Sequence, residues 1–213
     1  NQDFNASYNN TLNDNTVNTE SYINPMLYRG IMVDGVKSVG PSSADYPSIT
    51  AALADIVANG LSGAVYLELQ STYVSSVETF PLVFGASLPT TATNTITIRP
   101  QSGATGLTIT SSASQTIDLS GAKYIYFDGR PAGLGSSSEL TISNTITSGN
   151  AFRFINDAQY NNIQYCTVTG INTSATNGVI FFTTTSGTSG GNSYNTFNYC
   201  TIKDGTTLPS QLI

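Results

Sequence analysis

Short apolar runs separated by turn residues make up most of the chain, and within them apolar and polar positions alternate as they do in β-strands. The runs are rich in Val, Ile, Leu, Phe and Thr and begin roughly every ten residues, a spacing typical of all-β folds. We therefore predict strands at residues 64–69, 95–99, 107–110, 116–119, 124–127, 140–143, 151–155, 163–168, 179–183 and 196–202.

One segment has a helical pattern instead. Ile49, Leu53 and Ile56 fall on one face of a helix because their spacing matches the helical period. Ser48 is a suitable N-cap, and the Asn-Gly pair at 59–60 ends the pattern. We predict an amphipathic helix over residues 48–58. The polar residues 1–44 before it are predicted to form a leader that is extended or partly ordered.

One stretch of sequence occurs twice, 34 residues apart. Residues 161–170 read Asn-Asn-Ile-Gln-Tyr-Cys-Thr-Val-Thr-Gly, and residues 195–204 read Asn-Thr-Phe-Asn-Tyr-Cys-Thr-Ile-Lys-Asp. A fixed period of this size indicates a repeat protein in which each copy stacks on the next. An antiparallel sandwich also fits the strand spacing, but its strands have no reason to repeat. We therefore predict a parallel β-helix over residues 45–213.

The two ends of this β-helix differ in sequence. The predicted helix before the first strand is suited to cover the apolar end of the first coil. No such cap follows the last predicted strand, because the sequence ends with the polar and irregular residues 205–213. A bare last coil would pair with other chains, so we expect the natural polypeptide to continue with further coils beyond Ile213.

Composition narrows the range of partners. Charged residues are 9% of the chain, against roughly 25% in an average soluble domain, and the net charge is -6. Nucleic acid is bound by clustered cations, and the seven Lys and Arg are scattered, so the sequence argues against a nucleic-acid partner. No apolar run approaches the roughly 20 residues that span a bilayer, and we expect no membrane insertion.

Cys166 and Cys200 occupy equivalent positions of the repeat. In neighbouring coils they would lie about 4.8 Å apart, a spacing that permits either a disulfide or two reduced thiols. We favour the thiols, because a bridge between adjacent coils is strained. Two Cys and no His cannot complete a zinc site. The absence of His also removes the Ser-His and Cys-His nucleophilic pairs.

Five segments carry a family likeness: Tyr-Pro-Ser-Ile-Thr-Ala-Ala-Leu (46–53), Glu-Thr-Phe-Pro-Leu (78–82), Thr-Ile-Thr-Ile-Arg-Pro (95–100), Tyr-Ile-Tyr-Phe-Asp-Gly-Arg (124–130) and Phe-Arg-Phe-Ile-Asn-Asp-Ala (152–158). In this order they resemble the opening of the large β-helical surface proteins of Bacteroidetes. The resemblance implies an all-β fold, the pectin-lyase-like right-handed parallel β-helix. It also implies that the protein is secreted or held on the outer cell surface, that the type IX secretion machinery exports it, and that it acts as an adhesin, in some members in gliding motility.

The same likeness raises a catalytic alternative, because many pectin-lyase-like proteins cleave acidic polysaccharides with Asp clusters, Ca²⁺ and a basic residue. The most suggestive polar cluster is Asp128-Gly129-Arg130, directly after an apolar strand. It is either a sugar or Ca²⁺ site at a groove edge, or a tight turn in which Gly129 takes a positive φ and Arg130 pairs with Asp128. Asp157 and Asp204 lie beside strand ends, where they either help to bind Ca²⁺ or cap turns. We favour the turn in each case.

Arg153 and four tyrosines are further ligand candidates. Arg153 lies between two Phe residues, so alternation places it on the opposite face from both. It either binds a sugar or is a solvated side chain, and we favour the solvated side chain. The tyrosines form either an aromatic strip for sugar rings or ladders in the core, and we favour core ladders; they are Tyr124, Tyr126, Tyr165 and Tyr199.

The sequence thus predicts a non-catalytic secreted or cell-surface repeat protein that acts in adhesion or surface binding, with an extracellular polysaccharide or surface glycan as partner. We assign no catalytic, cofactor or metal residue, although Ca²⁺ is kept as an alternative; the ligand candidates are Asp128, Arg130 and Arg153. One rival is a polysaccharide lyase or hydrolase whose catalytic coils lie beyond Ile213. The other is a polysaccharide-binding module.

Overall fold

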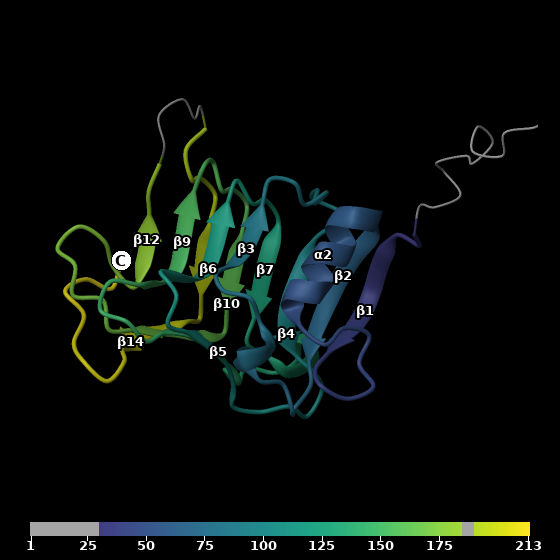
Figure 1. Ribbon diagram of the computed structural model, residues 1–213, viewed down its shortest axis with the longest axis horizontal. Coiled ribbons are helices and arrows are strands. Elements are labelled where there is room, and N and C mark those ends of the chain that lie inside the picture. The colour runs from purple at the N-terminus through teal and green to yellow at the C-terminus, as the bar shows by residue number, and fades with distance from the viewer. Residues whose placement is uncertain (1–29, 185–189) are drawn as a thin grey trace, which may run out of the picture. The chain divides into compact units, whose positions relative to one another are not determined.

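The structure is a computed structural model that describes residues 30–184 and 190–213. Residues 1–29 of the predicted leader lie outside the described residues. All helices and strands of the described part belong to one compact unit, Met32–Ile213. Its strands pair in parallel, and they form three sheets (Figure 1).

Each sheet collects one strand from successive coils. Sheet 1 contains β1 (Val33–Val39), β2 (Leu61–Leu69), β4 (Ile96–Pro100), β7 (Ile125–Asp128), β10 (Asn162–Gln164) and β13 (Thr196–Asn198). Sheet 2 contains β5 (Leu107–Ser111), β8 (Leu140–Asn144), β11 (Cys166–Gly170) and β14 (Thr201–Asp204). Sheet 3 contains β3 (Leu82–Gly85), β6 (Gln115–Ser120), β9 (Asn150–Ile155) and β12 (Ile180–Phe182).

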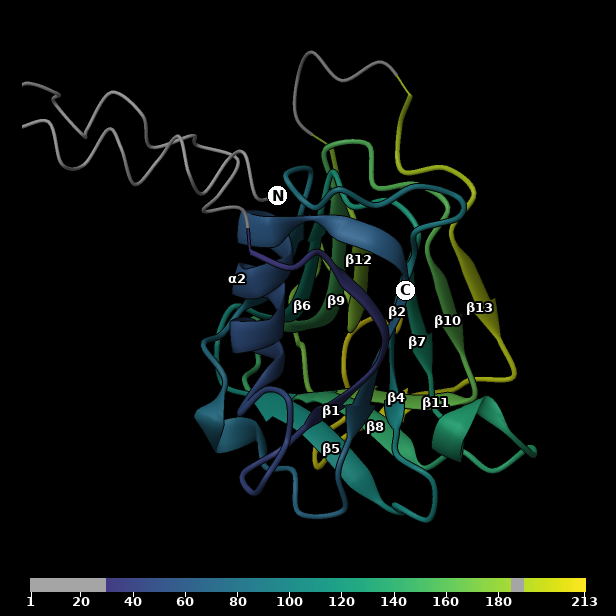
Figure 2. The ribbon, with the colours of Figure 1, turned by 90° about the vertical axis from the view of Figure 1, so that its right-hand side faces the viewer.

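From β4 onward the chain passes from sheet 1 to sheet 2 to sheet 3 in every coil. Figure 2 looks at the solenoid from the β1 side, and the chain runs clockwise around the three sheets as it moves away from the viewer. The winding is therefore right-handed, the hand that parallel crossover connections adopt. The predicted fold class, an all-β right-handed parallel β-helix, is confirmed.

The repeat in the sequence corresponds to one coil. Asn162 pairs with Thr196 in sheet 1, and Thr167 pairs with Thr201 in sheet 2, so both pairings join residues that are 34 positions apart. Equivalent residues of the two copies therefore lie next to each other in neighbouring coils. This confirms that each copy is one structural unit stacked on the next.

The core is the space enclosed by the three sheets, and it is filled by alternate residues of each strand. Phenylalanines from several strands meet there edge to face. The ring centroids of Phe84 and Phe127 are 5.5 Å apart, and those of Phe127 and Phe152 are 5.3 Å apart. All three side chains are fully buried. This geometry suits aromatic rings, so one continuous apolar column holds the sheets together.

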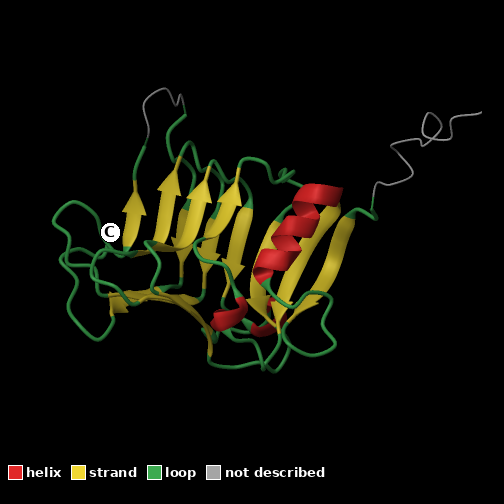
Figure 3. Ribbon diagram, viewed as in Figure 1, coloured by secondary structure: helices red, strands yellow, loops and turns green. Residues whose placement is uncertain are grey.

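Helix α2 (Ile49–Asn59) lies between β1 and β2 in the chain, and Figure 3 shows it in red beside the strands. Its first turn is capped twice: the Ser48 hydroxyl accepts the Ala51 N–H at 3.0 Å, and the Glu78 carboxylate accepts the Ile49 N–H at 2.7 Å. Gly60 ends the helix with a φ of 83°. The apolar face, Ile49, Ala52, Leu53 and Ile56, is buried against the first coils. The predicted helix is therefore confirmed, but it follows β1 in the chain instead of preceding the first strand.

Several features of the chain were not predicted. β1 lies inside the segment expected to be a leader and pairs with β2, so the solenoid begins before residue 45. β3 has no counterpart among the predicted strands. The single strand expected at 163–168 is two strands separated by Tyr165, and the one expected at 196–202 is likewise divided into β13 and β14. Two short 3-10 helices, η3 (Ser75–Val77) and η4 (Pro131–Gly133), interrupt the loops. None of the helices among the described residues has the length and apolar character needed to cross a bilayer.

Candidate functional site

Five tyrosines form two stacked ladders at the ends of strands in sheet 1. The upstream ladder, just before β7, β10 and β13, consists of Tyr124, Tyr160 and Tyr194, with centroid distances of 5.3 and 4.8 Å between neighbouring rings. The downstream ladder, directly after β10 and β13, consists of Tyr165 and Tyr199, with centroids 4.8 Å apart. Because the members come from successive coils, each ladder runs along the solenoid.

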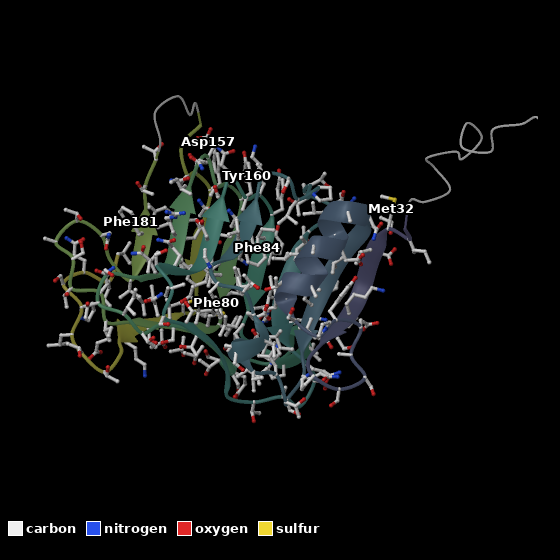
Figure 4. All side chains as sticks on the ribbon, in the orientation of Figure 1. Met32, Phe80, Phe84, Asp157, Tyr160 and Phe181 are labelled. Carbon is white, nitrogen blue, oxygen red and sulfur yellow. The ribbon has the colours of Figure 1, made fainter. Side chains whose placement is uncertain are left out.

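The ladders lie on the outside of the solenoid, so the expected core ladders of tyrosine are a wrong prediction. Figure 4 shows Tyr160 near Asp157, and Tyr160 is exposed whereas Phe84 is fully buried. Tyr194 is 70% exposed and Tyr199 is 78% exposed. The physical reason is the corner geometry: the tyrosines occupy the turns between sheets, where side chains point outward. Tyr126, the remaining candidate, is half-buried in β7 and belongs to neither ladder.

All five ladder residues have a left-handed backbone, with φ between 50° and 59°. This conformation is unusual for a bulky residue and persists only where the surroundings hold it in place. Beneath the upstream ladder, Asn161 accepts the Ile125 N–H at 3.0 Å and donates to the Ala122 carbonyl oxygen at 3.0 Å and to Asn195 at 2.9 Å. These buried amides fasten one coil to the next. The turns that carry the rings are therefore rigidly placed.

Between the two ladders, β10 and β13 present a row of amide and hydroxyl side chains to the outside. The row consists of Asn162, Gln164, Thr196 and Asn198, which alternate with the inward residues Ile163 and Phe197. The Thr196 hydroxyl donates to the Asn162 amide oxygen at 2.6 Å, and Thr196 and Asn198 are exposed. We term this row, together with Tyr160, Tyr165, Tyr194 and Tyr199, the amide face. It is an uncharged polar strip with an aromatic ring at each end of each strand.

Asp128 and Arg130, two predicted ligand candidates, come together beside this face. The guanidinium of Arg130 donates to both carboxylate oxygens of Asp128, at 2.9 and 2.7 Å, and Gln164 donates to the same carboxylate at 2.9 Å. Burial raises the pKa of Asp128, but the hydrogen bonds from Arg130 and Gln164 outweigh it and leave the pKa below its ordinary value. Arg130 also lies over the ring of Tyr165, 4.5 Å from its centroid. These contacts correspond to the local pairing that we favoured.

The expected role of Gly129 in this turn is wrong. Its φ is not positive, so conformational freedom is not the reason for a glycine here. A side chain at position 129 would instead overlap the carbonyl oxygen of Tyr165 in the next coil. The glycine is required because two backbones approach each other closely.

Arg153, the third ligand candidate, lies in another sheet. It points outward from β9, as alternation predicted, and its guanidinium donates to the carboxylate of Asp118 in β6 at 3.0 and 2.7 Å. Asp118 is only 4% exposed, so the pair fastens two coils of sheet 3 together. A third pair, Arg99 with Glu68 at 2.8 Å, does the same in sheet 1. The structure therefore brings Asp128 and Arg130 together but not Arg153.

The cysteines and the remaining carboxylates form no further cluster in the described part of the chain. Cys166 is buried, Cys200 is partly buried, and both are free thiols. Asp157 accepts a hydrogen bond from the Gly190 N–H at 3.3 Å, and Asp204 ends β14. Among residues 30–184 and 190–213, no three His, Cys, Asp or Glu side chains are grouped so that they could hold a metal ion.

Sequence reasoning missed several members of the amide face, although the signal was present. Tyr160 and Tyr194 precede the two copies of the repeat by one residue and keep its spacing of 34 positions. The outward amides follow from alternation with Ile163 and Phe197. Extending the repeat by one residue and separating its two faces would have identified the site.

Comparison of the chain with protein-family models, with curated proteins and with solved structures finds no match in any of the three. The geometry of the site and the character of the sequence are therefore the basis for assigning a function.

Proposed function

We propose that the protein is a non-catalytic, secreted or cell-surface β-helical protein that acts in adhesion, and that its amide face binds a neutral extracellular polysaccharide or surface glycan. The observation that carries the proposal is the row of outward amides and hydroxyls on β10 and β13 with exposed tyrosines at both ends. Sugar rings offer apolar faces and a rim of hydroxyls, and this combination of side chains is complementary to both.

The ladders restrict where a sugar can stack. Within a ladder the ring faces contact each other, so only ring edges and hydroxyls are open to a ligand. Tyr194 and Tyr199 are the last rings of their ladders among the described residues and are the most exposed. Their outer faces are the places where a pyranose ring would stack, while the amides between them donate to and accept from its hydroxyls.

The charges beside the face favour a neutral glycan over an acidic one. Arg130 is committed to Asp128 through two hydrogen bonds, and it also covers Tyr165. A guanidinium held in this way offers little to a carboxylate or sulfate of a ligand. The net charge of -6 for the chain repels polyanions further.

Rigidity and composition support an adhesive role. Corner amides and ion pairs fix successive coils to one another, so the binding groups keep their positions under load. A surface rich in Thr, Ser and Asn and poor in charge suits a protein exposed outside the cell. The family resemblance of residues 45–204 adds two further parts to this proposal. They are export by the type IX secretion machinery and a role in gliding motility.

The test is binding of the whole chain to an array of immobilised neutral oligosaccharides, with uronic acid and sulfated oligosaccharides beside them. We expect retention on neutral glycans. Because loss of one stacking ring is worth on the order of 1 kcal/mol, Tyr194→Ala and Tyr199→Ala should each weaken binding several-fold, roughly up to tenfold. Phe181→Ala, which removes an outward aromatic side chain from sheet 3, is the matched control and should bind as wild type does.

Three outcomes would count against the proposal. Retention only on acidic glycans would mean that the paired arginines are released to bind ligand. Equal binding by the wild type and both tyrosine variants would remove the amide face from the interaction. Shortening of the oligosaccharides during incubation would support the rival, a polysaccharide lyase or hydrolase.

A further inference from the structure

The outer face of sheet 2 carries two columns of side chains, all of which bear hydroxyls except Lys203. The first column is Thr108, Thr141, Thr167 and Thr201, one residue from each strand, and the pairing of the strands places them in register. The second column is Thr110, Ser143, Thr169 and Lys203, which pair in the same way. The residues between the columns, such as Ile109 and Ile142, are fully buried. We term these two columns the hydroxyl array.

The backbone determines the spacing of the array in both directions. Strands in one sheet lie about 4.8 Å apart, so this is the repeat along each column. Residues two apart on a strand are about 6.7 Å apart, which is the distance between the columns. A parallel sheet of this kind holds the Cβ atoms of each residue in place, and Thr has few rotamers. The hydroxyls therefore form a rigid two-dimensional lattice.

Most hydroxyls of the array are not used within the fold. Thr169 donates to Ser143 at 2.9 Å, and Thr167 lies 3.3 Å from the hydroxyl of Ser138. Among the described residues, the hydroxyls of Thr108, Thr110, Thr141 and Thr201 make no hydrogen bond to another residue. Lys203, at one end of the second column, is the only charged side chain among the eight positions. Thr169 is only 8% exposed. The open hydroxyls of the face are therefore those of Thr108, Thr110, Thr141 and Thr201, with almost no charge beside them.

We propose that the hydroxyl array binds the surface of ice. A single hydrogen bond exchanged with water contributes only about 1 kcal/mol, so an array of this kind gains affinity only if many groups bind one rigid object at once. Ice presents flat rows of water molecules at fixed repeats comparable to those of the array. Ordered water held between the Thr methyl groups would continue such a lattice at the protein surface.

A crystalline polysaccharide is the main competing ligand, and the side chains of the array argue against it. The faces of packed sugar rings are apolar and bind well to aromatic rings. None of the eight outward positions of sheet 2 carries an aromatic residue. The aromatic residues lie instead at the corners of sheet 1, in the amide face. The ice proposal does not rest on the proposed glycan function, because the two faces lie on different sheets.

The test is partition of the whole chain into a slowly growing ice front, with thermal hysteresis and ice-crystal shape measured on the same samples. We expect wild type to be enriched in the ice and to shape the crystals. Thr141→Lys places a long charged side chain in the middle of the first column, and we expect it to lower incorporation by roughly tenfold. Val36→Lys is the matched control, because Val36 is 56% exposed on β1 of sheet 1, and it should leave incorporation unchanged.

Circular dichroism and melting temperature establish that each variant is folded. The proposal would be overturned if the wild-type protein were excluded from ice and did not change the shape of the ice crystals. Equal incorporation of Thr141→Lys and wild type into ice would also overturn it. Retention of wild type on microcrystalline cellulose that Thr141→Lys abolishes, without ice binding, would reassign the array to a polysaccharide surface.

Discussion

The α-carbon of Gly129 lies directly against the carbonyl oxygen of Tyr165 in the next coil, and the Gly129 N–H donates to the carbonyl oxygen of Gln164 at 2.9 Å. Two coils thus meet backbone to backbone beside the amide face. Glycine is the only residue that permits this approach. The residue at position 129 in one coil therefore affects the position of Tyr165, a ladder residue, in the next coil.

Gly129→Ala should destabilise the protein, because the added methyl group overlaps a backbone atom that cannot move freely. We expect the free energy of unfolding to fall by about 1–3 kcal/mol, measured by chemical denaturation. Gly85→Ala is the control, since a Cβ there would lie 3.7 Å from its nearest neighbour, an ordinary contact, and it should change stability little. Equal stability of the two variants would mean that the coils separate easily at this corner.

Ile163→Asp should unfold the protein, because Ile163 is fully buried and the new carboxylate would have no partner. Phe197→Asp, the equivalent change one coil later, should cost less, because Phe197 is only partly buried. Thr196→Asp, an exposed position on the same strand, should keep the melting temperature near that of wild type. A wild-type melting curve for Ile163→Asp would show that the inward side of β10 is assigned wrongly.

Acid should weaken the fold through Asp128. Hydrogen bonds from Arg130 and Gln164 hold the pKa of Asp128 below its ordinary value of 3.8 despite burial, which acts in the opposite direction. A carboxyl whose pKa is lower in the folded state stabilises the fold fully above its unfolded pKa, and this contribution disappears as the pH falls through the folded pKa. The loss should therefore occur below about pH 4.

The measurement is the free energy of unfolding of wild type and Asp128→Asn between pH 7 and acid. At pH 7 the variant should be less stable by about 1–3 kcal/mol, because it loses hydrogen bonds to a charged group. Below the folded pKa the two proteins should converge. A constant difference at every pH would show that ionisation of Asp128 does not contribute.

The two thiols should react slowly with alkylating reagents while the protein is folded. Burial raises the pKa of Cys166 well above its usual value, and burial also raises the pKa of Cys200. Since the thiolate is the reactive form, we expect slow modification of the partly exposed Cys200 and modification of Cys166 only in denaturant. Mass spectrometry after iodoacetamide treatment measures both sites. Equal rapid labelling of the two in native buffer would contradict the packing of β11 and β14.

The fold could be predicted from the sequence because its main signals are local. Alternation within strands and the Ser48 cap each act over a few positions, and the repeat at 34 residues can be read directly from the sequence. The corners were not predictable in the same way. A left-handed tyrosine such as Tyr165 is stabilised by its neighbour Tyr199 in the next coil, which propensity does not capture, so one strand was expected where the chain turns.

The candidate site was predicted only in part, for a related reason. Alternation correctly placed Arg153 on the outside, but the sequence does not show that Asp118, 35 positions earlier, is its partner. Arg153 and Arg99 are each paired in the fold with a carboxylate from a neighbouring coil. The uncharged residues Asn162 and Gln164 were not predicted as ligand candidates. They lie on the surface between the two ladders.

The turn from sheet 1 to sheet 2 takes very different lengths without disturbing the strands on either side. In one coil it is the single residue Tyr165, whereas in the coil before it the chain loops out from Gly129 to Glu139, yet Asp128 still pairs with Gln164 and Leu140 still pairs with Cys166. Insertions at this corner therefore leave the pairing register of the neighbouring strands unchanged. Evolution, or a protein engineer, can graft a new loop beside the amide face coil by coil and diversify recognition while the scaffold stays the same.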